Sequence, residues 1–317
     1  MSQANPSKPI ESFRVPNSIV QGLTTTTPAG LNRLTSFQMV TLFGLMAHVS
    51  SKHPDKEVRL KVCEILEIIR ISKCVTQAIE RIWTDGDGRQ HHGHYRVPRY
   101  SPRHMEKVHE ALLALHNQSV AIHYFDPNSG LKIKDHIVHL LDSFGYCYQA
   151  DGRQLDVDDL PRDRSRVNVA TDDRPVWKVR RRTAGGHQYE RPTAVTFRLN
   201  RELAQEILGS KGTIRFTLFA HRVFDLFRDY VGSPAAIRLV VLTLRQIHSE
   251  FTRCLTPTLD DLGFDTSHLE RGVKYLEEVL ERLRGDEIVT GFAIDREADR
   301  ITITLNRDWY RGPMEAG

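Results

Sequence analysis

The chain has 317 residues, of which 40% are hydrophobic and 26% are charged, and its formal net charge is +4. This length fits one large domain or two ordinary ones, and the hydrophobic content is enough for packed cores. No apolar run reaches the roughly 18 residues that a membrane span needs. The four cysteines are scattered without a CxxC pair and the first residues are polar, which favours reduced thiols in the cytoplasm over disulfides or a zinc site.

In the first half, residues 1–33 are rich in Thr, Ser, Pro and Asn, and we expect a flexible arm. Residues 35–50 are apolar almost all round, which predicts a buried helix. Alternating apolar residues over 57–62 predict a short strand, and residues 63–72 a short helix.

Residues 73–83 are expected to add a helical turn, and the Gly-containing stretch 84–100 is expected to be a polar loop. An amphipathic helix follows over 101–118, where Ser101 suits the N-cap and Pro102 the first helical position. Two strands and a turn over 119–146 then predict a β-hairpin.

The second half repeats this order. A strand and a helix that stops at Gly209 lead to a helix over 221–231 and to a buried helix over 233–250, capped by Ser233. A short helix capped by Thr256 or Thr258, a long amphipathic helix and a hairpin follow. The long helix has an apolar stripe of residues spaced by three or four: Leu269, Val273, Leu276, Leu280 and Leu283.

Each half therefore has the order buried helix, short helix, amphipathic helix and hairpin, which is the order of a winged helix-turn-helix. We predict an α+β fold with two tandem winged-helix domains, over 34–147 and 193–311. A polar, basic linker over 148–192 joins them. Within it, residues 161–192 carry nine Arg or Lys against four Asp or Glu, a balance that attracts polyanions and also occurs in solvated linkers.

The third helix of a winged helix has one face free, and its width of about 10–12 Å fits a major groove about 12 Å wide. The candidate DNA-binding residues come from both amphipathic helices, from both hairpins and from the linker. They are Ser267, His268, Arg271, Lys274, Arg282, Arg296 and Arg300 in the second half, Arg103, His104, Lys107, Lys132 and Lys134 in the first half, and Lys178, Arg180, Arg181 and Arg182 in the linker.

A solvated helix is the alternative interpretation of the same charges. Residues 267–285 hold four basic and four acidic side chains, and Glu270–Lys274 has the i,i+4 spacing common on exposed helix faces. Many winged helices bind proteins, so a protein-interaction module stays open as an alternative.

Three stretches of the second half are distinctive together: VTFRLNRELAQEIL, FTLFAHRVFDLFRDYVGSPAAIRLVVLTLRQI and TLDDLGF, followed by the long helix and a hairpin ending in ITITLN. Over 194–310 they resemble the plasmid replication initiator proteins built from two tandem winged helices. The first half matches that family in the order of its elements only.

The resemblance implies sequence-specific binding to repeated origin sites (iterons) in double-stranded DNA and initiation of plasmid replication. It also implies recruitment of host initiator or helicase proteins and repression of the protein's own promoter by a dimer. In this family the second winged helix makes the main base contacts, here Ser267, His268, Arg271 and Lys274. The first contributes backbone contacts and the homodimer interface. A winged-helix transcriptional regulator would use the same DNA chemistry.

An enzyme is the remaining alternative. Rolling-circle initiators cut DNA with a Tyr and hold a metal through a His-hydrophobic-His motif, and the chain has His91, His92, His94, Tyr95 and Tyr100 in RQHHGHYRVPRY. The residue between the last two histidines is a glycine, the stretch is expected to be a loop, and no acidic ligand stands beside it. The chain also lacks GxxxxGK[ST], GxSxG and HExxH. We therefore predict a binding protein that is not an enzyme, with no metal, no cofactor and no membrane partner.

Overall fold

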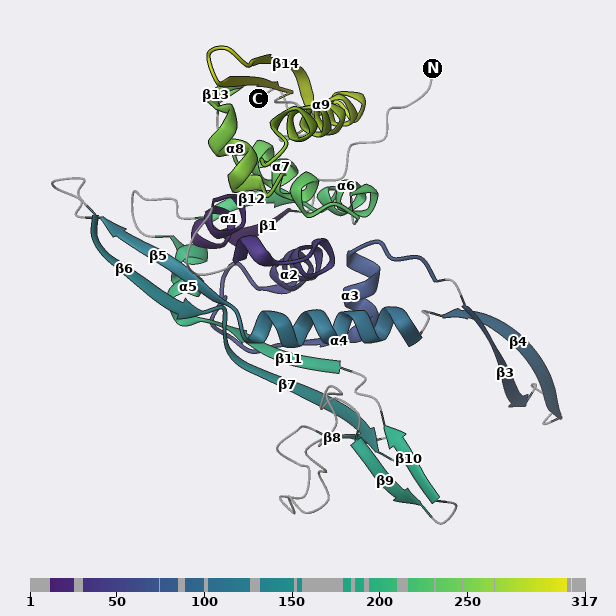
Figure 1. Ribbon diagram of the computed structural model, residues 1–317. Helices are drawn as coiled ribbons and strands as arrows, with labels where there is room; N and C mark the ends of the chain where they lie inside the picture. The colour runs from purple at the N-terminus through teal and green to yellow at the C-terminus, as the bar shows by residue number, and fades with distance from the viewer. Residues whose placement is uncertain are drawn as a thin grey trace, which may run out of the picture.

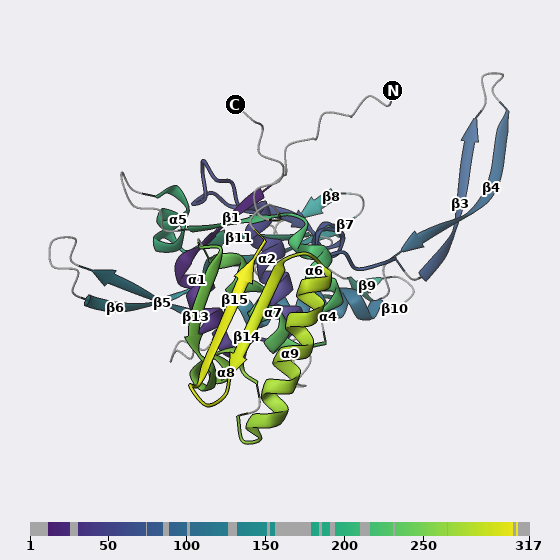
Figure 2. The same cartoon turned by 90° about the horizontal axis from the view of Figure 1, so that it is seen from above.

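The fold comes from a computed structural model, which describes residues 12–25, 31–73, 75–84, 89–99, 102–125, 132–150, 153–155, 179–183, 186–190, 194–209, 216–230, 232–246, 248–264, 266–306 and 309. Helices form a central body, and β-hairpins project from it (Figures 1 and 2). The expected mixture of helices and sheets is confirmed. No helix in the described ranges is long and apolar enough to cross a membrane.

The N-terminal segment is part of the body. β1 (Ser12–Pro16) pairs antiparallel with β12 (Phe216–Ala220) of the second half. α1 (Asn17–Thr24) and the 3-10 helix η1 (Leu31–Arg33) follow it. The flexible arm expected over 1–33 is therefore wrong for these described residues, because their apolar side chains are buried in the core.

Three predicted helices of the first half are confirmed and pack on one another: α2 (Ser36–His48), α3 (Val62–Ile68) and α4 (Pro102–His116). The start of α2 has a capping box. The Thr35 side chain accepts from the backbone N–H of Gln38, and the Gln38 side chain accepts from the backbone N–H of Thr35.

The region between α3 and α4 differs from the prediction. β3 (Val75–Thr84) and β4 (Gln90–Arg99) form an antiparallel hairpin, so the helical turn over 73–83 and the loop over 84–100 are both wrong. β3 is rich in β-branched and aromatic residues, which favour strands. Asp-Gly pairs between the strands are also a common hairpin signal in sequences.

One sheet combines strands from both predicted domains. Its order is β2 (Val58–Lys61), β11 (Ala194–Leu199), β7 (Leu141–Ala150) and β8 (Arg153–Leu155). β11 pairs antiparallel with both β2 and β7. The domain boundary expected at residue 193 would therefore assign β11 to a different domain from β2 and β7, the strands with which it pairs.

The hairpin expected over 119–146 is confirmed as β5 (Ser119–Phe125) and β6 (Lys132–His139). Its second strand was expected to continue to residue 146 and instead ends at His139, because the following residues form β7 in another sheet. The expected linker over 148–192 contains secondary structure where it is described. There, β9 (Val179–Thr183) and β10 (Gly186–Glu190) form another antiparallel hairpin.

The second half begins with helices close to those predicted. α5 (Arg201–Leu208) ends at Gly209, whose φ of 71° suits glycine. α6 (Val223–Asp229) follows, and then α7 (Pro234–Arg245), whose N-cap Ser233 accepts from the backbone N–H of Ala236. α7 ends five residues earlier than the predicted helix, which extended to residue 250.

The remaining elements are β13 (Glu250–Cys254), α8 (Leu255–Leu262), α9 (Leu269–Gly285), β14 (Val289–Asp295) and β15 (Arg300–Leu305). The helices and the final hairpin were predicted, whereas β13 was not. The strands form a three-stranded sheet in the order β13-β15-β14, and α9 lies against β14 (Figure 2).

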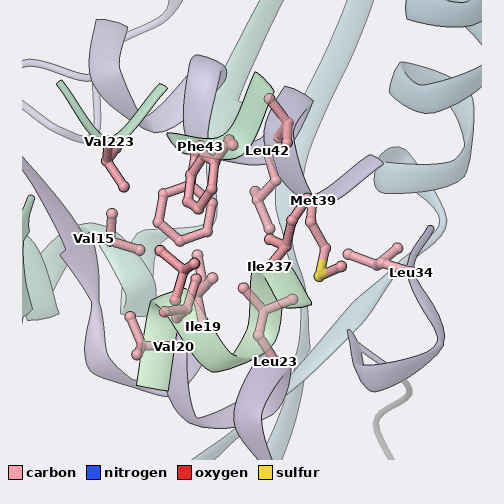
Figure 3. Packing of buried hydrophobic residues seen from close by; sticks show 14 of the residues in the cluster. Val15, Ile19, Val20, Leu23, Leu34, Met39, Leu42, Phe43, Val223 and Ile237 are labelled. Carbon is pink, nitrogen blue, oxygen red and sulfur yellow. The ribbon is translucent and has the colours of Figure 1, made fainter. Parts of the chain in front are cut away.

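The core connects both halves. A single hydrophobic cluster includes buried side chains from the N-terminal segment to β15. In Figure 3, Val15 and Ile19 lie near Phe43 of α2. The Phe43 ring is edge-on to Phe219 of β12 and Phe227 of α6, with centroid distances of 5.1 and 5.0 Å. The two halves are thus packed together through aromatic contacts.

Candidate nucleic-acid interface

The long helix α9 has a buried face and an exposed face. Val273, Leu276, Leu280 and Leu283 are buried as predicted, and α9 packs on α7, α8 and β14. The stripe does not include Leu269, which is 42% exposed. The prediction is wrong for Leu269, which is the first residue of the helix and precedes its first buried residue, Gly272. Gly272 and Val279 complete the buried face.

The predicted contact residues of α9 lie on its exposed side. Ser267, His268, Arg271, Lys274 and Arg282 are all exposed. Figure 2 shows α9 beside β14 and β15 at the surface of the body. The second-half helix therefore presents an open polar face, as a groove-binding helix requires.

Charge is unevenly distributed along that face. The N-terminal half of α9 has Arg271 and Lys274 with one acidic residue, whereas Glu277, Glu278 and Glu281 gather in the C-terminal half. Arg282 and Arg284 lie among these carboxylates, and Arg284 is paired with Glu281. The basic end of α9 is therefore its first two turns.

A cleft runs along this basic end. It has a volume of about 520 Å³ and is lined by Phe264, Arg271, Gly272, Lys274, Tyr275 and Glu278. Tyr275 is 39% exposed, and its ring is edge-on to Phe264 with 5.5 Å between centroids. An aromatic floor between cationic side chains is suited to the mixed apolar and anionic surface of a nucleic acid.

A second cleft adjoins the first, because Phe264 and Tyr275 line both. Its volume is about 490 Å³, and it also contains the exposed Arg33 of η1 and Ser233 at the start of α7. Sequence reasoning missed Arg33 because the segment before α2 was expected to be a flexible arm. The sequence signal that could have revealed this segment is the spacing of apolar residues over 13–23, which indicates packed structure before α2.

Arg238 of α7 holds the base of the second cleft together. It is 6% exposed and donates hydrogen bonds to the carbonyls of Leu262 (2.9 Å), Leu34 (3.3 Å) and Asn32. Burial lowers the pKa of Arg238 from its usual high value. These bonds join the end of α8 to the segment that carries Arg33, and so fix Arg33 relative to α9.

Gly263 provides the space that this arrangement needs. It ends α8 with a φ of 75°, and a Cβ there would overlap Nη1 of Arg238. A residue with a side chain at this position would be strained in the left-handed conformation and would also displace the guanidinium.

The turn between β14 and β15 carries the predicted Arg296 and Arg300, both exposed. Arg296 Nη2 is 3.5 Å from Glu277 Oε1, which links the turn to α9. Asp299, with a φ of 48°, accepts from the backbone N–H and the hydroxyl of Thr256 at 2.9 and 2.8 Å. The turn is thereby fixed to α8 as well.

The expected N-caps of α8 are wrong. The helix begins at Leu255, its N-cap is Cys254, and no side chain caps it. Thr256 donates its hydroxyl to the hairpin turn instead. Thr258 donates its hydroxyl to the carbonyl of Cys254 at 2.6 Å, within the first turn.

The first-half candidates lie on a separate surface. Arg103 and Lys107 of α4 are exposed and His104 is half-buried. Lys107 Nζ lies 6.0 Å from the centroid of the Phe37 ring of α2, so it also covers the neighbouring helix. α4 contacts α2, α2 contacts α7, and α7 contacts α9. Thus α2 and α7 stand between the two candidate helices (Figure 1).

The other candidates belong to the hairpins. Lys132 and Lys134 lie on β6, in register with Phe125 and Tyr124. Arg180, Arg181 and Arg182 lie on β9, and Lys178 falls outside the described residues. The histidines and Tyr95 of the nicking alternative lie on β4, and Tyr100 falls outside the described residues.

No protein-family profile matches the sequence, and no curated protein is similar to it. Solved structures are similar at low sequence identity. The crystal structure of Pi initiator protein in complex with iteron DNA covers 95% of this chain and all of its own, with 8% identity and a TM-score of 0.48. Two crystal structures of domains 2 and 3 of RctB each cover 86% of this chain and 82% of their own, with 10% and 11% identity and TM-scores of 0.43 and 0.41. An initiator protein is thus among the structures that this chain resembles.

Proposed function

We propose that the protein binds double-stranded DNA in a sequence-specific manner and initiates plasmid replication at repeated origin sites. The observation that carries the proposal is the exposed basic end of α9, with an aromatic cleft beside it and a β-hairpin fixed to it. A helix and a hairpin held in this way can contact a groove and the flanking backbone together.

The order α7, β13, α8, α9, β14 and β15 supports a winged helix-turn-helix in the second half. In that arrangement α9 is the recognition helix and the β14–β15 hairpin is the wing. The first half has a comparable group in α2, β2, α3 and α4, with the β3–β4 hairpin inserted before its third helix. We propose that it contributes backbone contacts and the homodimer interface.

Different residues of α9 serve different contacts in this proposal. Arg271 suits the paired acceptors of guanine in the major groove, because its planar guanidinium can donate to both. In this proposal the exposed Lys274 and His268 make flanking contacts, and Ser267 lies near the helix start, where backbone N–H groups favour phosphate. Arg33 extends the basic surface from α9 to η1.

The first experiment measures binding to a library of plasmid-origin duplexes over a range of salt concentrations, without nucleotide. Counterion release lowers log K by about 0.9 per neutralised phosphate for each unit of log salt. We expect a steep slope and enrichment of one short repeated sequence. A flat slope, or no enrichment, would favour the protein-interaction module.

A matched pair of variants tests the role of α9. Arg271→Ala is expected to cost about 1–3 kcal/mol of binding energy and to relax specificity at one base pair. Arg284→Ala on the same helix is the control, because Arg284 is at the carboxylate-rich end and paired with Glu281. Equal losses from both variants, with specificity unchanged, would contradict the assignment.

Four further tests address the alternatives and the remaining parts of the proposal. A plasmid with the enriched repeats should replicate in a host only when the protein is supplied, whereas a transcriptional regulator would bind the repeats without supporting replication. The same transformants report whether the protein represses its own promoter, and pull-down with purified host initiator and helicase tests those partners.

Supercoiled DNA incubated with the protein and Mn²⁺ or Mg²⁺ should stay uncut. A nick with the DNA end attached to Tyr95 or Tyr100 would overturn the non-enzymatic proposal.

A further inference from the structure

The second cleft beside α9 lies at the starts of two helices. Thr35, the N-cap of α2, and Ser233, the N-cap of α7, both line it, and α2 packs on α7. The N-terminus of a helix carries a partial positive charge, because its first N–H groups have no partner within the helix. Two such positive ends therefore lie at one cleft.

A backbone donor remains at the start of α7. The Ser233 side chain accepts from the N–H of Ala236, and Pro234, at the first helical position, has no N–H. This leaves the N–H of Ala235 as the donor of the first turn, and Ala235 also lines the cleft.

The charged side chains of the cleft are cationic. The described residues that line it include two arginines, Arg33 and Arg238, and no aspartate or glutamate. Arg33 is exposed, so its guanidinium is accessible to a ligand. Arg238 is 6% exposed and bonded to backbone carbonyls, and its Nε–H has no acceptor within the described part of the chain. Burying such a charge is costly unless an anion lies near it.

We propose that this cleft is a binding site for a phosphate group. Helix N-termini and arginine side chains are the groups with which proteins commonly bind phosphate. Arg33 and the N–H of Ala235 would donate to the phosphate oxygens, and Arg238 would contribute its charge from the base of the cleft. Phe264 and Tyr275 line the same cleft and would pack against the sugar or base that carries the phosphate.

Two sources have this chemistry: the backbone of a duplex that lies on α9, and a free phosphate compound. The inference concerns the anion, and it does not depend on DNA binding by α9. The experiment therefore has one arm for the anion alone and a second arm for the source.

Gly232 offers a position at which the charge of the cleft can be changed. It lines the cleft, a Cβ on it would meet no atom within 4 Å, and its φ lies outside the left-handed region. Gly232→Asp adds a carboxylate to the cleft, and Gly232→Asn is the matched control, because it adds a neutral side chain of the same shape. Arg33→Ala removes the exposed cation.

In the first arm, inorganic phosphate and pyrophosphate are each titrated into the full chain by calorimetry at constant ionic strength. We expect saturable binding of one equivalent, weakened about tenfold by Gly232→Asp and by Arg33→Ala because of the changed charge, and retained in Gly232→Asn. The proposal is overturned if neither anion binds saturably, or if the Asp and Asn variants bind with equal affinity. Circular dichroism of each variant checks that it is folded.

In the second arm, a duplex with the enriched repeats is titrated with the same variants, with and without pyrophosphate at constant ionic strength. If Gly232→Asp weakens duplex binding more than Gly232→Asn does, and pyrophosphate competes, the site holds a phosphate of the DNA backbone. If duplex binding is the same in both variants while anion binding differs, the site holds a free phosphate compound. A chain that binds phosphate as described but no duplex would refute the proposed function and support this inference.

Discussion

Replacing Arg238 by methionine removes the guanidinium that joins α7, the end of α8 and the segment carrying Arg33. Methionine keeps an unbranched stem that ends near the position of Nε, so the main loss is of the guanidinium and its hydrogen bonds. Three backbone carbonyls, those of Leu262, Leu34 and Asn32, then lose a donor. Because the site is buried, water replaces that donor only in part.

The expected magnitude follows from these contacts. Hydrogen bonds to a charged group contribute about 1.5–3 kcal/mol each. Removing the guanidinium also removes the cost of burying a charge whose described partners are carbonyls and not carboxylates, which offsets part of the loss. We expect a net decrease of about 2–4 kcal/mol in the free energy of unfolding.

Urea denaturation followed by circular dichroism measures this change, at a constant m-value. Arg245→Met is the control on the same helix, since within the described part of the chain the bond of Arg245 Nη1 is a long one, 3.5 Å to Thr24 Oγ1. We expect it to cost less than about 1 kcal/mol. The reasoning is refuted if Arg238→Met is as stable as the wild type, or if both variants lose the same amount.

Three other predictions concern binding and stability. Arg33→Ala should weaken binding to all DNA sequences alike and reduce the slope of log K against log salt by about 0.9. A change in base preference would contradict a phosphate contact. Glu206→Gln should lower the free energy of unfolding by about 1–3 kcal/mol, because the buried carboxylate accepts from the backbone N–H and the hydroxyl of Ser18 at the start of α1; an unchanged urea midpoint would argue against it. Burial lowers the pKa of His48, an effect that His221 adds to and Glu64 opposes, so its stabilising contribution is present above the ordinary pKa of about 6.5 and lost as the pH falls through the lowered value. His48→Gln should therefore flatten the acid side of a stability-against-pH curve, and a curve parallel to the wild type would exclude His48 as the cause.

Elements defined by local signals could be predicted from the sequence. The start of α7 follows from Ser233 and Pro234, and the end of α5 from Gly209, because caps and backbone conformations depend on a few adjacent residues. The buried face of α9 follows from its spacing, since a helix repeats every 3.6 residues. The exposure of Arg271 and Lys274 could be predicted as well, because these residues lie outside that buried face.

Elements defined by distant partners could not be predicted in this way. β1 is a strand because β12, from the other half of the chain, pairs with it, and its own residues give a weak signal. The position of Arg33 next to the cleft beside α9 depends on the bonds of Arg238 to the neighbouring backbone. The β3–β4 hairpin could not be predicted for another reason, because a polar, Gly-containing stretch such as 84–100 is typical of a loop.

The shared sheet and core also constrain how the protein would sit on DNA. With β11 joined to β2 and β7, and β1 joined to β12, neither half can rotate freely against the other. The body then holds α4 and α9 at a fixed distance and orientation relative to each other. If both helices touch one duplex, their two contact points have a set helical phase. Inserting half a turn of DNA, about 5 base pairs, between them would turn one contact to the far side of the duplex.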